Sequence, residues 1–143
     1  MVNNTMKVSS FDHVSLVTTD LDRSIAFYHD ILGLHQIQRP AFKSAGAWMS
    51  SGSFEIHLTV NPNGHLRRHR RIDPGDIHFG VRVADFAAAM RHLKANGYSE
   101  HLPDGEAKRL FLRLDGPAPF QQAFLLDPDN HVIEINNAPL KAS

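Results

Sequence analysis

Three histidines and one glutamate stand at matching places in the two halves of this 143-residue sequence. His13 and His78 belong to the first strand-like segment of each half, and His57 and Glu134 to the last, where "EIHLT" superposes on "VIEIN". Three neutral imidazoles and one carboxylate form a suitable ligand set for zinc, nickel, iron(II), manganese or cobalt, with positions left for water or substrate. The pattern therefore predicts one divalent metal ion per chain.

Alternation of side chains along residues 53–60, SFEIHLTV, shows how such ligands would be presented. One side of this predicted strand is apolar, and the other carries Glu55 and His57. His13 and His78 lie on similar mixed sides of their own strands. Because the apolar sides can pack against helices, we expect the mixed sides to line a shared cavity. Glu55 is then a partner that orients an imidazole, an alternative ligand, or a solvated carboxylate at the rim.

The two halves repeat one strand-helix-strand-strand-strand unit. "FDHVSLVTTDLDRSIAFYHDILGL" and "DIHFGVRVADFAAAMRHLKANGY" each read as a strand followed by an amphipathic helix. Asp20 and Asp85 are candidate N-caps, and Gly33 and Gly97 suit the left-handed position after each helix. Further strands are predicted at residues 35–42, 47–50 and 54–60 in the first half, and near 100–102, at 110–113 with 120–126, and at 131–136 in the second.

These elements predict an α+β fold made of two βαβββ modules. The predicted division is an N-terminal extension at 1–10, a first module at 11–62, a connector at 63–75, a second module at 76–137 and a C-terminal tail at 138–143. Within the connector, the basic run "HLRRHRR" could fold over the cavity and hold an anionic substrate, or could be a solvated link.

Composition argues against several classes of function. Fifteen basic residues balance fifteen acidic ones, so the charge indicates neither nucleic-acid nor membrane binding. The absence of cysteine excludes disulfides, thiolate nucleophiles and zinc-thiolate sites, and is compatible with a cytoplasmic protein. "MVNNTMKVSS" lacks the apolar core of a secretory signal, and no run approaches membrane-spanning length.

The sequence resembles the vicinal oxygen chelate superfamily, which includes glyoxalase I, bleomycin-resistance proteins and extradiol dioxygenases. The resemblance covers about residues 11–137 and rests on the two segments quoted above and on "FLLDPDNHVIEI". It implies an incomplete eight-stranded barrel around a metal cavity, and a homodimer. The metal ligands that it implies are His13, His57, His78 and Glu134. The substrate contacts that it implies are Arg39, Trp48, Gln122 and Phe124, with Trp48 as plain core filler the alternative.

The resemblance implies a divalent-metal-dependent enzyme, a glyoxalase-like lyase or isomerase whose small substrate chelates the metal through adjacent oxygens. Glu134 or Glu55 would transfer the proton. Two alternatives stay open. His13, His78 and Glu134 alone would satisfy an iron-dependent dioxygenase of catechol-like substrates, and His57 stands where glyoxalase I usually carries a carboxylate or glutamine. The other alternative is a non-enzymatic small-molecule binding or resistance protein.

Overall fold

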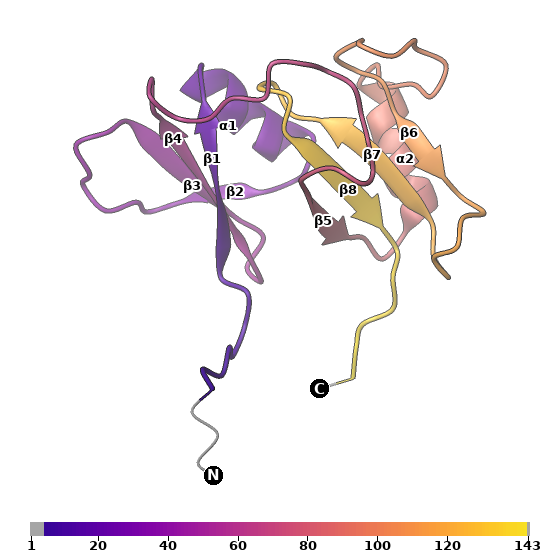
Figure 1. Cartoon of the computed structure of the whole chain (residues 1–143), viewed down its shortest axis with the longest axis horizontal. Helices are drawn as coiled ribbons and strands as arrows, with labels where there is room; N and C mark the ends of the chain where they lie inside the picture. The colour runs from indigo at the N-terminus through magenta and orange to yellow at the C-terminus, as the bar shows by residue number, and fades with distance from the viewer. Residues whose placement is uncertain (1–4, 143) are drawn as a thin grey trace.

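Two βαβββ modules lie side by side in the computed structural model, which describes residues 5–142 (Figure 1). The predicted extension at 1–10 and tail at 138–143 therefore lie partly outside the described residues. The first module contains β1 (His13–Thr18), α1 (Leu21–Asp30), β2 (His35–Ile37), β3 (Gly46–Ser50) and β4 (Glu55–Val60). The second contains β5 (His78–Arg82), α2 (Phe86–Ala95), β6 (Phe111–Arg113), β7 (Gln122–Leu126) and β8 (Val132–Asn136). The predicted α+β fold of two such modules is confirmed.

Each module forms one four-stranded mixed sheet. Sheet A has the strand order β1-β4-β3-β2, and sheet B has the order β5-β8-β7-β6. The first and last strands of each module pair in parallel, and the remaining pairs are antiparallel. β1 and β5 each lie at an edge of their sheet, and no ladder joins the two sheets in the described part of the chain. The eight strands are thus divided between two sheets that the chain links through the connector.

Both helices begin and end as the sequence predicts. The carboxylates of Asp20 and Asp85 accept hydrogen bonds from the backbone N–H three residues later, at 3.0 and 2.9 Å. After the helices, Gly33 and Gly97 adopt φ values of 70° and 88°, which a side chain with a Cβ would disfavour. Each helix therefore stops where the chain must turn back toward its sheet.

The core follows from strand alternation. In β4, Ile56 and Leu58 are buried in the apolar cluster, while His57 between them faces the other side of sheet A. The large cluster contains buried residues from both modules, so the modules share one core. A smaller cluster lies on the other side of sheet B, where Ile72 of the connector covers Phe124. Burial thus separates a helix-facing side of each sheet from a mixed side.

One predicted strand is wrong. Residues 100–102 form turns, with only an isolated bridge between Ser99 and Arg109 nearby, and the second strand of module 2 is β6. Pro103 and Gly105 follow directly, and Gly105 has a φ of 91°, so the backbone bends before a ladder can form. Over residues 5–142, no helix has the length and apolarity needed to cross a membrane.

Candidate functional site

His13 and His57 form a pair on the mixed side of sheet A. β1 and β4 are neighbours, and the parallel register sets Ser15 opposite His57 and His13 opposite Glu55. The two imidazole rings stack with their centroids 3.9 Å apart and an interplanar angle of 13°. Because Ser15 is small, the ring of His57 has room beside β1. The structure therefore brings together the two predicted ligands of the first module.

A carboxylate holds one nitrogen of each ring. His13 Nδ1 lies 2.5 Å from an Asp12 carboxylate oxygen, and His57 Nε2 lies 2.7 Å from a Glu55 carboxylate oxygen. An ionised carboxylate can only accept, so these nitrogens carry the protons. The second nitrogen of each ring, Nε2 of His13 and Nδ1 of His57, has no hydrogen-bond partner among residues 5–142. Glu55 therefore orients the His57 imidazole, which is one of the three roles that the sequence left open for it.

Trp48 and Arg39 are two predicted substrate contacts. Both already contact other groups of the protein. β4 lies between β1 and β3, and the Trp48 ring stacks on the outer side of His57 at 4.0 Å and 3°. Arg39 donates to the carbonyl oxygen of Ser44 at 3.0 Å, and its guanidinium lies 4.8 Å above the Phe42 ring. Trp48 thus supports a ligand candidate, and Arg39 braces its own loop.

His78 and Glu134 form the second pair, on the mixed side of sheet B. The register places Glu134 opposite Gly80, two residues along β5 from His78. His78 Nδ1 lies 2.8 Å from the backbone carbonyl oxygen of Asp76, so Nδ1–H donates and Nε2 is left as the acceptor. The edge of the His78 ring contacts Phe124, with centroids 5.5 Å apart and an angle of 76°.

Two amides hold the Glu134 carboxylate. Gln122 Nε2 donates to one oxygen, and Asn136 Nδ2 donates to the other at 2.6 Å. Gly80 makes room for this arrangement, because a Cβ built there would stand 3.1 Å from the Glu134 oxygen. Glu134 is 9% exposed, so its orientation is fixed by these contacts and by the strand. Gln122, a predicted substrate contact, instead positions a predicted ligand.

The four predicted ligands fit a metal by chemistry but not by position within one chain. Each of the three histidines has one nitrogen bonded to an acceptor and the other without a partner in residues 5–142, which is how proteins fix metal-binding imidazoles. However, the two pairs belong to different sheets, and no group of three His, Asp or Glu side chains in the described chain could hold an ion. Imidazole lone pairs lie in the ring plane, so one stacked ring must also rotate before both point at one ion.

A polar network, largely buried, connects the two modules. The turn between β7 and β8 reaches across to the first module: Tyr28 of α1 donates its hydroxyl hydrogen to Asp127 at 2.8 Å, and Thr19, just before α1, donates to Asp129 at 2.5 Å. Burial raises the pKa of Asp127, and burial followed by the Asp127 charge raises that of Tyr28 well above its ordinary value. The network is thus a polar contact inside an otherwise apolar junction.

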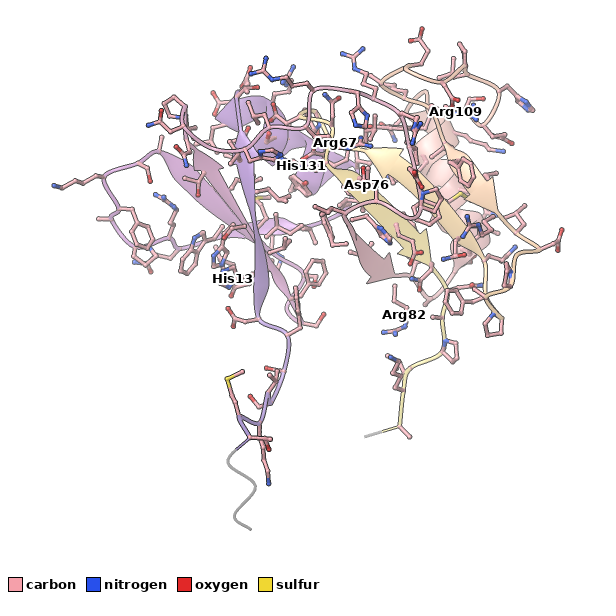
Figure 2. The ribbon with its side chains drawn as sticks, in the orientation of Figure 1. His13, Arg67, Asp76, Arg82, Arg109 and His131 are labelled. Atoms are coloured by element: carbon pink, nitrogen blue, oxygen red, sulfur yellow. The ribbon has the colours of Figure 1, made fainter. Side chains whose placement is uncertain are left out.

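His131 and Arg67 extend this junction (Figure 2). His131 Nε2 donates to the backbone carbonyl oxygen of Val17 at 2.8 Å. Arg67 donates to the carbonyl of Asn130 and forms an ion pair with Asp76 at 3.6 Å. One arginine of the basic run therefore anchors the connector to module 2, next to the residue whose carbonyl holds His78.

Sequence reasoning missed Asp12 and Asn136. Asn136 lies two residues after Glu134 on the same side of β8, so strand alternation could have identified it. Asp12 directly precedes His13, before β1 begins, and alternation would place it on the opposite side. In the folded chain, however, the carboxylate turns back to the ring.

Comparisons with known proteins agree with this architecture. Residues 10–135 match the model of the Glyoxalase/Bleomycin resistance protein/Dioxygenase superfamily. The chain is 29% identical over 138 residues to "Glyoxylase I 4" of Arabidopsis thaliana, covering 94% of this chain and 74% of that protein. It is 30% identical over 138 residues to a lactoylglutathione lyase of Haemophilus influenzae, covering 91% and 94%. The crystal structure of a glyoxalase family protein from Bacillus anthracis superposes with a TM-score of 0.72 at 21% identity, covering 94% of this chain and 99% of that one. The chain therefore belongs to the glyoxalase/bleomycin resistance protein/dioxygenase superfamily.

Proposed function

We propose that this protein is a divalent-metal-dependent enzyme, a glyoxalase-like lyase or isomerase acting on a small substrate that offers two adjacent oxygens. The ligands in this proposal are His13, His57, His78 and Glu134, two from each module. The observation that carries it is the state of the three imidazoles: each has one nitrogen held by an oxygen acceptor and the other without a hydrogen-bond partner among residues 5–142. His92 and His131 share this arrangement, so what distinguishes His13, His57 and His78 is their place on the mixed sides of β1, β4 and β5.

A homodimer would complete such a site. The His13–His57 pair and the His78–Glu134 pair lie on separate sheets, and the outer edges of β1 and β5 pair with no strand in the described part of the chain. If two copies oppose sheet A of one to sheet B of the other, each pair meets its complement, and the dimer holds two equivalent sites. The proposal therefore includes a dimer as a requirement of the chemistry.

A bound divalent ion would act as a Lewis acid toward the substrate oxygens. The chain itself supplies orientation and proton transfer. Asp12, Glu55 and the carbonyl of Asp76 fix which nitrogen of each histidine stays unprotonated. Glu134 is the proposed proton acceptor, and its two amide donors hold it in one position rather than leaving it to rotate.

Metal analysis tests the proposal. Protein purified without a histidine tag or added metal should contain about one divalent ion per chain by plasma mass spectrometry. The His13→Ala/His78→Ala double variant should lose it, while the matched control His29→Ala/His101→Ala, which alters two exposed histidines, should keep it. Equal metal content in both double variants would contradict the site. No metal in the unaltered protein, even after reconstitution, would favour a non-enzymatic binding protein.

An iron-dependent dioxygenase is the second candidate, and the surroundings of His57 favour it. Its ring is bonded to Glu55 and stacked between Trp48 and His13, so protein groups cover both of its faces. Without it, two histidines and Glu134 remain, the ligand set of many iron(II) oxygenases. Oxygen uptake with a catechol, unchanged in His57→Ala and lost in His78→Ala, would establish this candidate over the first.

A further inference from the structure

A cleft of about 1110 Å³ lies between the two modules, outside the two candidate ligand pairs except at His78. It exceeds the usual range of ligand pockets, about 300–1,000 Å³, so a ligand-sized molecule can enter. Most of its wall is apolar, and both modules contribute. Representative side chains are Val14, Ile31 and Leu32 from module 1 and Phe79, Val81 and Leu93 from module 2.

Among the described residues that line this cleft, a single side chain carries a permanent charge, and that charge is positive. Among the described residues that line it, none is acidic, and Arg82 is the sole arginine or lysine. His92 also lines the wall, but its Nε2 already donates to the carbonyl oxygens of Asp30 and Ile31 at the end of α1. An apolar cleft with one cationic group and no acid is complementary to an organic anion with an apolar body.

Arg82 is held in place for such a role. Its Nε donates to the carbonyl oxygen of Ala138 at 2.6 Å, which fixes the planar guanidinium on the C-terminal segment (Figure 2). Its two terminal nitrogens have no hydrogen-bond or ion-pair partner in the part of the chain that the structure describes. A guanidinium with both terminal nitrogens free can bind a carboxylate through two parallel hydrogen bonds.

The mouth of the cleft is also apolar. Phe11 and Leu140 line it, yet they are 70% and 82% exposed. Large apolar side chains gathered at the edge of a cleft mark ligand or partner sites. We propose that the cleft binds an amphipathic carboxylate, with its head group on Arg82 and its hydrocarbon body between the modules.

Calorimetric titration of metal-free protein with decanoate, kept below its micelle concentration, tests this inference. Because EDTA is present throughout, the outcome is independent of the proposed metal chemistry. We expect saturable binding that weakens about 10- to 100-fold in Arg82→Leu, the loss typical of one hydrogen-bonded charge. Arg113→Leu is the matched control: it removes an arginine from the same sheet, outside the cleft, and should change affinity less than twofold.

Further variants and a neutral ligand test whether binding occurs in the cleft and depends on charge. Ala89→Trp, which fills the cleft without removing charge, should abolish binding. If circular dichroism shows that Arg82→Leu does not fold, Arg82→Gln provides a second variant without the charge. Neutral decanol should bind more weakly than decanoate. The inference is overturned if decanoate does not saturate, if decanol binds equally well, or if folded Arg82 variants keep full affinity. A dimer whose interface closes the cleft would give the first of these results.

Discussion

Replacing Tyr28 by phenylalanine should weaken the junction between the two modules. The Tyr28 hydroxyl is fully buried and donates to Asp127 at 2.8 Å. Phenylalanine fills nearly the same volume, so no cavity adds to the cost. What is lost is one hydrogen bond to a buried carboxylate, and such bonds contribute about 1.5–3 kcal/mol. We therefore expect Tyr28→Phe to lower the free energy of unfolding by about 2 kcal/mol at neutral pH.

This cost should depend on pH in a direction that the structure fixes. Burial raises the pKa of Asp127 above its ordinary value of 3.8, so the folded state binds this proton more tightly than the unfolded state. The stabilising contribution of that proton is full below pH 3.8 and is lost as pH rises through the folded pKa. Without the Tyr28 donor the ionised form is disfavoured further. Tyr28→Phe should therefore cost more at pH 7 than near about pH 4.

Urea unfolding at the two pH values provides the assay. Trp48, the single tryptophan, reports on module 1, while far-ultraviolet circular dichroism reports on both modules. Divergence of the two signals in Tyr28→Phe would show that the hydroxyl couples the modules. Tyr98→Phe is the control, because Tyr98 is buried but its hydroxyl has no hydrogen-bond partner within residues 5–142. If Tyr28→Phe costs no more than Tyr98→Phe, or costs the same at both pH values, the reasoning is refuted.

Three further predictions concern a glycine, an amide and a phenol. Gly46→Ala should destabilise the protein by about 1–3 kcal/mol in urea unfolding, because a Cβ there would lie 2.4 Å from the backbone oxygen of Leu58; a neutral result would mean that β3 can shift. Asn136→Leu should reduce turnover and metal affinity, since one Glu134 oxygen loses its donor; unchanged metal content would assign Asn136 a purely structural role. Burial raises the pKa of Tyr98 to about 12, so stability should fall as pH rises from about 10 toward 12, and less so in Tyr98→Phe.

Local rules predicted the helices because their signals are local. Each N-cap carboxylate and each C-terminal glycine acts within a few residues, and both pairs are confirmed. The short strand β6 falls within the predicted residues 110–113, although a three-residue strand carries little alternation and is defined by pairing with β7. Residues 100–102 could satisfy a short strand pattern equally well, but the turn around Gly105 excludes a ladder there. Long-range pairing thus decides where short strands form.

The sequence predicts which sheet carries each candidate residue, but not the side chains that it contacts. The repeat and the strand period correctly group His13 with His57 and His78 with Glu134 on their sheets. They cannot show that Trp48 stacks on His57, or that Gln122 is committed to Glu134, because rotamers are chosen among neighbours on adjacent strands.

The repeat also explains how one architecture supplies two unlike halves of a site. His57 and Glu134 occupy equivalent positions on the last strands, and each faces a small residue on the first strand, Ser15 or Gly80. The small neighbour gives either side chain room beside the parallel strand. In module 1 carboxylates then hold imidazole rings, whereas in module 2 amides hold a carboxylate. The same local geometry therefore presents a nitrogen donor, His57, on sheet A and an anionic oxygen donor, Glu134, on sheet B, and the proposed set of three nitrogens and one oxygen draws on both modules.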